Sequence, residues 1–212
     1  MIKAVVFDFD GTLVDSNRLK NDAFVEIFSG DPHISEALVR DTLARNVGTR
    51  FDILRDIFVR LGAAPEEIEK SVARYADRFD ERIQKGIQEK GLVAGAREVL
   101  ERLSADRCLY INSATPQPAL HAVVAQLSIA RYFKAVHGVP PTKEENLREI
   151  IGREGVAPEE VAVVGDGESD RHAAHTCKTH FIGVVNDFNQ WQGTAFPLVA
   201  GIREAEAIIQ KI

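Results

Sequence analysis

Residues 1–16 read MIKAVVFDFDGTLVDS, a short apolar stretch that runs directly into two aspartates and a glycine. The β-branched and aromatic residues predict a buried strand over Met1–Phe9, which Gly11 ends. Asp8 and Asp10 then lie at the carboxyl end of this strand. In open α/β sheets, ligands bind beyond the carboxyl ends of the strands. The stretch therefore predicts an α/β protein with a group of acidic side chains at the carboxyl end of its first strand, where a ligand can bind.

The region after Gly95 alternates short apolar strands with helices. The predicted strands are Cys108–Asn112, Lys134–Val139, Val161–Gly165 and His180–Val185. This alternation is typical of a parallel sheet with crossover helices, so we expect a Rossmann-like core. We expect the first strand to join the same sheet, because a lone strand cannot cover its own edges.

Residues 15–90 carry apolar residues at helical spacing instead. Amphipathic helices are predicted over Asn17–Ser29 and Phe51–Leu61, and a longer helix is predicted to begin at Pro65 and to end before Gly91. The expected fold class is thus α/β with an inserted all-helical cap domain. The predicted boundaries are 1–14 and 91–212 for the core and 15–90 for the cap.

A second acidic turn, GDGESD, follows the predicted strand that ends at Gly165 and contains Asp166 and Asp170. Either acidic turn alone would be an ordinary solvated turn. Together they predict that several carboxylates converge. Two carboxylates about 4 Å apart repel by roughly 4 kcal/mol at an effective dielectric near 20, so they must bind a proton or a cation. Ligands that are all oxygen atoms favour Mg²⁺.

Two further segments offer groups for a phosphate. Ser113 and Ala114 lie just before a predicted helix, where hydroxyl and backbone N–H groups can bind an anion. In isolation such a serine is more often a plain N-cap. Thr142 and Glu145 fit a capping box, which places Lys143 in the first turn of a helix. A cation there opposes the helix dipole and is locally unfavourable, which suggests a functional role for Lys143. The alternative interpretation is a plain exposed lysine.

These motifs together resemble the haloacid dehalogenase superfamily with a helical cap, of the β-phosphoglucomutase and phosphoglycolate phosphatase branch. The resemblance implies that Asp8 is the nucleophile that attacks phosphorus and that Asp10 is the general acid and base. It implies a Mg²⁺ site made of Asp8, the backbone carbonyl of Asp10 and Asp166, with Asp170 either as a further ligand or as an acid that contacts the ligands. It also implies that Ser113, Ala114 and Lys143 bind the phosphoryl oxygens. A covalent aspartyl-phosphate would divide the reaction into two easier displacements.

The resemblance also points to residues of the predicted cap that contact the substrate. Gly48-Thr49-Arg50 is similar to a cap loop that brings an arginine to the substrate, and Asn17 and Lys20 are further candidates. An exposed arginine at a helix start is an equally good interpretation of Arg50. The mutase branch typically has a histidine where this chain has Lys20, which disfavours a mutase.

The expected function is a Mg²⁺-dependent phosphatase for a small phosphorylated metabolite, such as a sugar phosphate or phosphoglycolate. One alternative is a phosphomutase of the β-phosphoglucomutase type, which would form an isomer instead of releasing phosphate. Another is a non-catalytic regulator that binds a phosphorylated ligand. The acids and the lysine that catalysis needs are all present, which disfavours a regulator.

Composition excludes other classes of partner. The net charge is −6 and the pI is near 5.6, whereas nucleic acids and anionic lipids require a positive surface. No apolar run approaches the roughly 18 residues of a membrane span. We therefore expect a cytoplasmic monomer or homodimer whose two cysteines are reduced. A separate group, His172, His175, Cys177 and His180, matches no closed zinc pattern, and no role is predicted for it.

Overall fold

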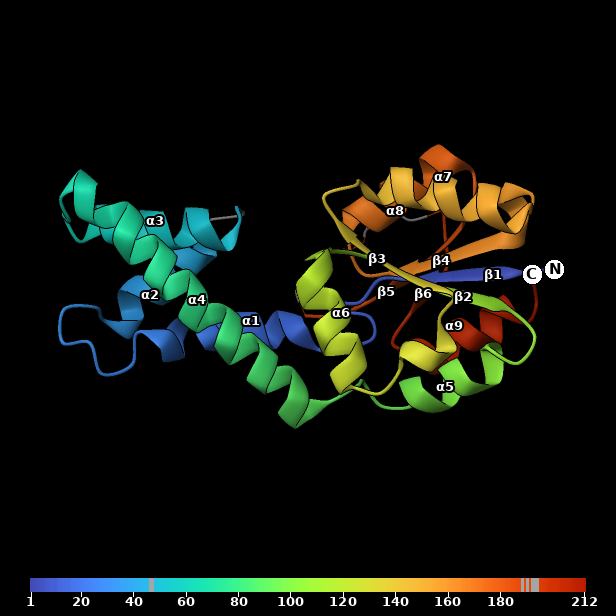
Figure 1. Cartoon of the computed structure of the whole chain (residues 1–212), viewed down its shortest axis with the longest axis horizontal. Helices are drawn as coiled ribbons and strands as arrows, with labels where there is room; N and C mark the ends of the chain where they lie inside the picture. The colour runs from blue at the N-terminus through green and yellow to red at the C-terminus, as the bar shows by residue number, and fades with distance from the viewer. Residues whose placement is uncertain (46–47, 188, 190, 192–194) are drawn as a thin grey trace. The chain divides into compact units, whose positions relative to one another are not determined.

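The computed structural model describes residues 1–45, 48–187, 189, 191 and 195–212. Contacts within the chain divide it into two compact units (Figure 1). The first unit contains Met1–Asp15 and Lys90–Ile212, and the second contains Ser16–Glu89. The second unit is thus inserted into the first, after the first strand.

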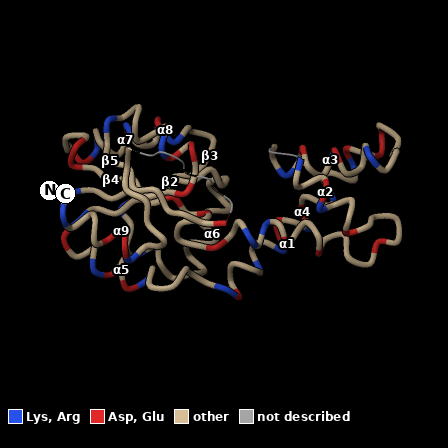
Figure 2. The backbone as a smooth tube through the Cα atoms, turned by 180° about the vertical axis from the view of Figure 1, so that it is seen from behind, with Lys and Arg blue, Asp and Glu red and all other residues tan. Residues whose placement is uncertain are grey.

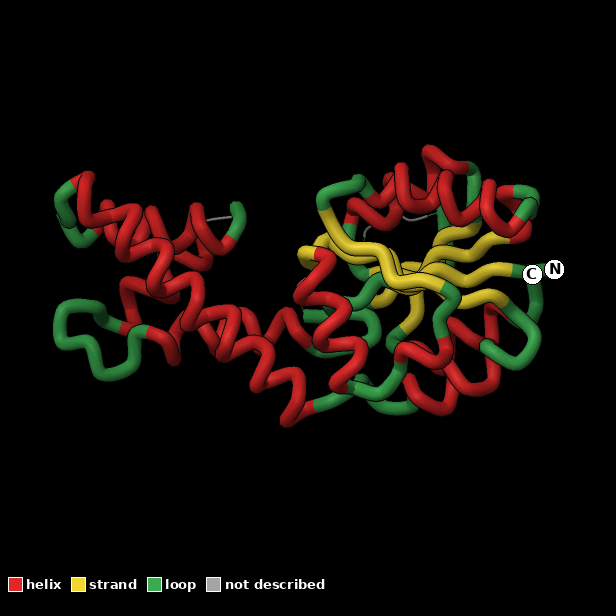
Figure 3. Tube along the Cα trace, viewed as in Figure 1, coloured by secondary structure: helices red, strands yellow, loops and turns green. Residues whose placement is uncertain are grey.

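The first unit is built on a parallel sheet, drawn in yellow in Figure 3. Its described strands are β1 (Ala4–Phe7), β2 (Cys108–Pro116), β3 (Ala135–Val139), β4 (Val161–Gly165), β5 (His180–Val184) and β6 (Leu198–Val199). They lie in the order β3-β2-β1-β4-β5-β6, and all neighbours pair in parallel. The predicted parallel α/β sheet is confirmed. The sequence did not reveal β6, because two residues are too few to show a periodic pattern.

Helices cover both faces of this sheet. The helices are α5 (Ala96–Leu103), α6 (Gln117–Gln126), α7 (Lys143–Glu154), α8 (Glu168–Cys177) and α9 (Ile202–Ile209), with 3₁₀ turns η1 (Ala130–Tyr132) and η2 (Pro158–Glu160). Figure 1 shows α7 and α8 on one face and α5 and α9 on the other. Because both faces are covered, all four residues of the central strand β1 are buried, and its sequence is continuously apolar.

The face under α7 and α8 carries a core that links the sheet to these helices. Val6 of β1 and Tyr110 of β2 belong to one buried cluster with Leu147 and Ile150 of α7 and Ala173 of α8. In the chain, α7 follows the end of β3 and α8 follows the end of β4. Their N-termini therefore lie at the same edge of the sheet as the carboxyl ends of the strands.

The second unit is helical. It contains α1 (Ser16–Ile27), α2 (Glu36–Arg45), α3 (Arg50–Arg60) and α4 (Pro65–Lys90). Aromatic side chains form much of its core. The ring centroids of Phe24 and Phe79 lie 4.4 Å apart, and those of Phe28 and Tyr75 lie 4.5 Å apart. The predicted all-helical insertion is confirmed, and α1 and α3 begin one residue before their predicted starts.

Acidic and basic residues are interleaved along both units, as Figure 2 shows. Several ion pairs join two exposed side chains, such as Arg55 with Glu69 and Arg40 with Glu36. Exposed pairs of this kind contribute little to stability. Among the described residues, no helix has both the length and the apolar character needed to cross a membrane.

Candidate active site

The carboxyl end of β1 presents Asp8, which is 5% exposed. Its backbone N–H donates to the carbonyl of Val164 in β4 at 2.8 Å, which fixes the end of β1 against its neighbour. The chain then turns sharply, since the N–H groups of both Leu13 and Val14 donate to the carbonyl of Phe9. Gly11 has a φ of +78°, a conformation that favours glycine.

Lys143 is the first residue of α7. The predicted capping box is confirmed, because Thr142 caps the helix and the side chain of Glu145 accepts from the Thr142 N–H at 2.7 Å. From this position the Lys143 Nζ donates to Asp8 Oδ1 at 2.9 Å and to Asp170 Oδ1 at 2.6 Å. The Lys143 side chain is only 10% exposed. It is therefore a buried cation shared by two acids, and the alternative of an exposed lysine is wrong.

Asp8, Asp166 and Asp170 form one cluster, in which an oxygen of each carboxylate lies within 4.8 Å of the others. It is the one group of three or more potential metal ligands of the His, Cys, Asp and Glu types in the part of the chain that the structure describes. Asp170 also accepts from the N–H of Gly167 at 3.2 Å. Three carboxylates at this spacing offer the oxygen donors that Mg²⁺ prefers, so the residues fit such an ion.

The charge balance of the cluster favours a further cation. Burial raises the pKa of Asp8 well above its usual range, and the Asp170 carboxylate raises it further against the opposing effect of Lys143. Burial also raises the pKa of Asp170. Burial acts to lower the pKa of Lys143, but its two carboxylate partners outweigh burial and raise it. One ammonium group among three carboxylates leaves excess negative charge that a divalent ion would neutralise.

Ser113 lies in β2, which runs to Pro116, four residues beyond its predicted end. The plain N-cap alternative for Ser113 is wrong, because Pro116 is the N-cap of α6 and no side chain caps that helix. Ser113 is buried, and its Oγ accepts from the N–H of Thr115 at 3.0 Å. The Thr115 hydroxyl in turn donates to Asp10 Oδ2 at 2.6 Å. The extended strand thus joins the predicted phosphate segment to the second acid of the first motif.

Comparison with known proteins bears on this arrangement. The family model of haloacid dehalogenase-like hydrolases matches residues 2–177. The chain belongs to this family. Curated relatives of this hydrolase include the phosphoglycolate phosphatase of Vibrio parahaemolyticus, which is 30% identical over 200 residues (89% of this chain and 86% of the relative). That of Synechococcus elongatus is 29% identical over 198 residues (90% and 87%). A solved structure of a candidate β-phosphoglucomutase from Thermotoga maritima has a TM-score of 0.80 at 25% identity and covers 100% of both chains.

The predicted membership of the haloacid dehalogenase superfamily is confirmed. This chain is an enzyme of that hydrolase family, and the phosphatases among its relatives support the predicted cleavage of phosphomonoesters. The relatives match along most of the chain, so the similarity includes both the sheet and the helical insertion.

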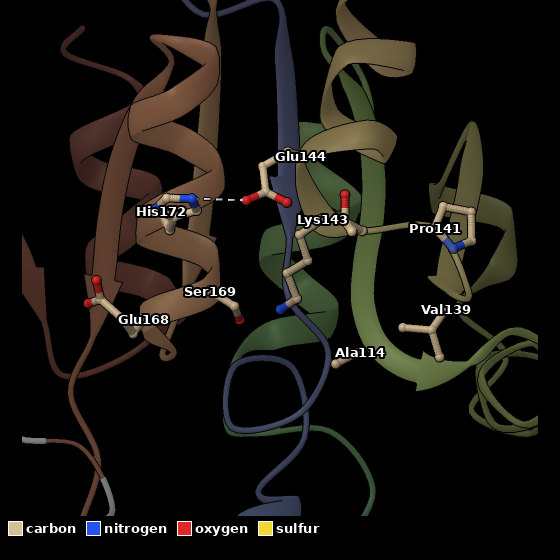
Figure 4. Close-up of a pocket in the computed structure, with 9 residues that line it drawn as sticks. Ala114, Val139, Pro141, Lys143, Glu144, Glu168, Ser169 and His172 are labelled. Atoms are coloured by element: carbon tan, nitrogen blue, oxygen red, sulfur yellow. Dashed lines mark ion pairs between the residues drawn. The ribbon is translucent and has the colours of Figure 1, made fainter.

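A pocket of about 390 Å³ opens beside Lys143 in the first unit (Figure 4). Its lining consists of Ala114, Val139, Pro141, Thr142, Lys143, Glu144, Glu168, Ser169 and His172. Figure 4 shows Ala114 and Val139 at one side and Ser169 and Glu168 of α8 at the other. His172 of α8 pairs with Glu144 of α7 at 3.2 Å. The phosphate-binding candidates Ala114 and Lys143 thus face one concave surface of this hydrolase.

The helical unit contains the other predicted site residues. Arg50 begins α3, where Thr49 and Asp52 form a capping box. Its guanidinium pairs with Asp80 Oδ2 at 3.0 Å and lies 4.4 Å from the ring centroid of Phe51. Arg50 is therefore held in place, with its side chain 28% exposed, and is not a freely exposed arginine. Asn17 and Lys20 lie in the first turns of α1 and are half-buried.

Several residues around the site of this hydrolase were not predicted. Asn186 Nδ2 donates to Asp166 Oδ2 at 2.6 Å, and Asn112 Nδ2 donates to the carbonyl of Lys143 at 2.9 Å. Asn112 also accepts from Asn146 Nδ2 at 3.0 Å. A buried asparagine at the end of an apolar strand was the available signal for Asn112, because a buried amide requires hydrogen-bond partners.

Proposed function

We propose that this chain is a Mg²⁺-dependent phosphatase that hydrolyses a small phosphorylated metabolite, with 2-phosphoglycolate the first candidate, through an aspartyl-phosphate at Asp8. The observation that carries the proposal is the buried carboxylate of Asp8, which lies 2.9 Å from the Lys143 ammonium and in one cluster with Asp166 and Asp170. A carboxylate nucleophile repels a phosphoryl dianion, so the attack requires positive charge at this place.

The residues of the site suit the two steps of such a reaction. An oxygen of Asp8 attacks phosphorus, the bond from phosphorus to the ester oxygen breaks, and Asp10 donates a proton to the leaving alcohol. Asp10 then takes a proton from water, which attacks phosphorus and releases Asp8. Lys143 and Ser113 would hold the phosphoryl oxygens. Asp8, Asp166, Asp170 and the Asp10 carbonyl would hold Mg²⁺, which when bound neutralises phosphate charge and fixes in-line geometry.

The relatives support a small anionic substrate. The two curated relatives described above are phosphoglycolate phosphatases. Arg50 offers a planar guanidinium whose geometry suits a carboxylate. Asn17 and Lys20 are further candidates for contacts with the part of the substrate that lies beyond the phosphate. We therefore place a phosphorylated carboxylic acid ahead of sugar phosphates and nucleotides.

The test measures phosphate release from a panel of phosphorylated acids, sugar phosphates and nucleotides, with and without Mg²⁺. The substrates are ranked by kcat/KM, which compares transition-state stabilisation directly. We expect Asp8→Asn to abolish turnover, because its neutral amide cannot attack phosphorus. Glu98→Gln, an exposed carboxylate change on α5, serves as the matched control and should retain activity. Melting temperatures establish that both variants are folded.

The alternatives give different results in the same assay. A mutase would convert a hexose 1-phosphate into its 6-phosphate isomer with little phosphate release. A non-catalytic regulator would release phosphate from no member of the panel. Turnover by Asp8→Asn at the wild-type rate would contradict the assignment of the nucleophile.

A further inference from the structure

The hydroxyl of Thr115 makes a hydrogen bond to Asp10 across 105 residues of sequence, and the reaction described above does not use it. The Thr115 Oγ1 donates to Asp10 Oδ2 at 2.6 Å. Asp10 is the residue that must give a proton to the leaving alcohol, and proton transfer requires a heavy-atom distance of about 2.6–3.2 Å to the leaving oxygen. Any group that fixes the orientation of the Asp10 carboxyl therefore affects this step.

Thr115 is itself held firmly. Its backbone N–H donates to Ser113 Oγ at 3.0 Å, and β2 and β3 change register between Asn112 and Pro116. A side chain on Gly138 of β3 would meet the Thr115 carbonyl at 2.4 Å, so the absence of a side chain at Gly138 allows the two strands to approach. A β-branched residue also has few χ1 rotamers. The position and direction of the Thr115 hydroxyl are consequently determined by the sheet.

Gln117 adds a second restraint at the same place. Its side-chain amide donates to the carbonyl of Val136 at 2.7 Å and accepts from the N–H of Gly138. The side chain of Gln117 thus binds β3 on both sides of His137. These two hydrogen bonds hold Gly138 of β3 close to Thr115 near the end of β2.

We propose that Thr115 is a positioning residue that orients the Asp10 carboxyl for proton transfer to the leaving group. The proposal rests on the proposed phosphatase function. Because the hydroxyl donates to Oδ2, that oxygen acts as an acceptor, and the transferable proton lies on Oδ1. When the bond from phosphorus to the ester oxygen breaks, the electron pair stays on that oxygen, which takes the Oδ1 proton and leaves as an alcohol. Asp10 remains as a carboxylate whose Oδ2 still accepts from Thr115.

The leaving group provides a readout that a purely structural role would not change. An alkyl phosphate needs a proton on its departing oxygen, whereas p-nitrophenyl phosphate releases a stable phenolate that needs none. The quantity to measure is kcat/KM, because it covers only the steps up to the first irreversible one and excludes the later hydrolysis of the aspartyl-phosphate. The alkyl substrate is the best one found in the metabolite panel.

Thr115→Val keeps the shape of the side chain and removes the hydroxyl. We expect it to lower kcat/KM for the alkyl phosphate by about 10- to 100-fold, a part of the roughly 10²- to 10⁴-fold that general acid catalysis contributes, with a much smaller loss for p-nitrophenyl phosphate. Thr115→Ser restores the hydroxyl and should recover most of the loss. Gly138→Ala keeps the hydroxyl but displaces the Thr115 backbone, and should show the same selectivity. If Thr115→Val does not fold, Gly138→Ala and Thr115→Ser provide the comparison.

The outcomes separate this proposal from the proposed function. An active wild-type enzyme whose Thr115→Val variant loses equal activity on both substrates, or none on either, would overturn the role of Thr115 alone. Failure of Thr115→Ser to recover activity would also overturn it. A wild-type chain that releases phosphate from neither substrate would overturn the phosphatase function and the role of Thr115 with it.

Discussion

Gly165→Ala tests how closely the acidic cluster is packed. Gly165 ends β4, and an ideal Cβ at this position would lie 2.4 Å from Asp170 Cγ, 2.6 Å from its Cβ and 2.7 Å from its Oδ2. Carbon atoms that are not bonded separate to about 3.5–4.0 Å. The carboxyl group of Asp170 therefore has to retreat by about 1 Å. Asp170 is 2% exposed, so no solvent-filled space is available to receive it.

This displacement affects both stability and catalysis. Asp170 would weaken its bonds to Lys143 Nζ, now 2.6 Å, and to the N–H of Gly167, now 3.2 Å. Overpacking of this kind costs about 1–3 kcal/mol. For a chain of this length each kcal/mol lowers the melting temperature by about 2–4 °C, so a decrease of roughly 2–12 °C is expected. A shift of about 1 Å in a catalytic group can reduce kcat/KM by about 100-fold.

Gly152→Ala is the matched control. Gly152 lies on the exposed side of α7, and a Cβ there would meet no heavy atom within 4 Å. The same chemical change should stabilise this helix by about 1 kcal/mol, because alanine has the higher helix propensity. Thermal melts and kcat/KM with Mg²⁺ measure both variants. A Gly165→Ala enzyme that melts and turns over like the wild type would refute the packing argument, and so would equal destabilisation by both changes.

Three further predictions concern the surroundings of the site. Asn112→Ala leaves the buried Asn146 amide without its acceptor and should cost about 2–3 kcal/mol in urea unfolding, so a change below about 0.5 kcal/mol would contradict it. The Tyr110 hydroxyl donates to Glu154 and holds the pKa of Glu154 below its usual range. The stability that this hydrogen bond contributes is present above the ordinary glutamate pKa and is lost as the pH falls through the lowered pKa. Tyr110→Phe should therefore flatten the decline of stability as the pH falls below the ordinary glutamate pKa, and an unchanged pH profile would refute the linkage. Mg²⁺ at 100 times its Kd should stabilise the wild type by about 2.7 kcal/mol and so raise its melting temperature, and chelation should reverse the change. The shift should be smaller in Asp166→Asn, and a melting temperature insensitive to Mg²⁺ would exclude binding at this cluster.

Much of this protein could be predicted from local sequence. The apolar run before Asp8 predicted a buried strand, and Thr142 with Glu145 predicted the start of α7 and the place of Lys143 in its first turn. These features depend on residues that are close together along the chain. Strand propensity, helix capping and turn formation are determined by interactions over a few residues, so they can be read without knowledge of the rest of the fold.

Other features were decided only by the tertiary structure. The sequence could not show that Thr115 donates to Asp10, that Asn186 donates to Asp166, or that Arg50 pairs with Asp80. Each of these contacts depends on strand register, on loop geometry and on which helix packs beside which strand. A side chain selects among many possible distant partners only after the core has packed, because packing of the whole unit brings those partners within hydrogen-bond distance. The local sequence therefore determined which chemical groups lie at the end of the sheet, and the packed fold determined which of them touch.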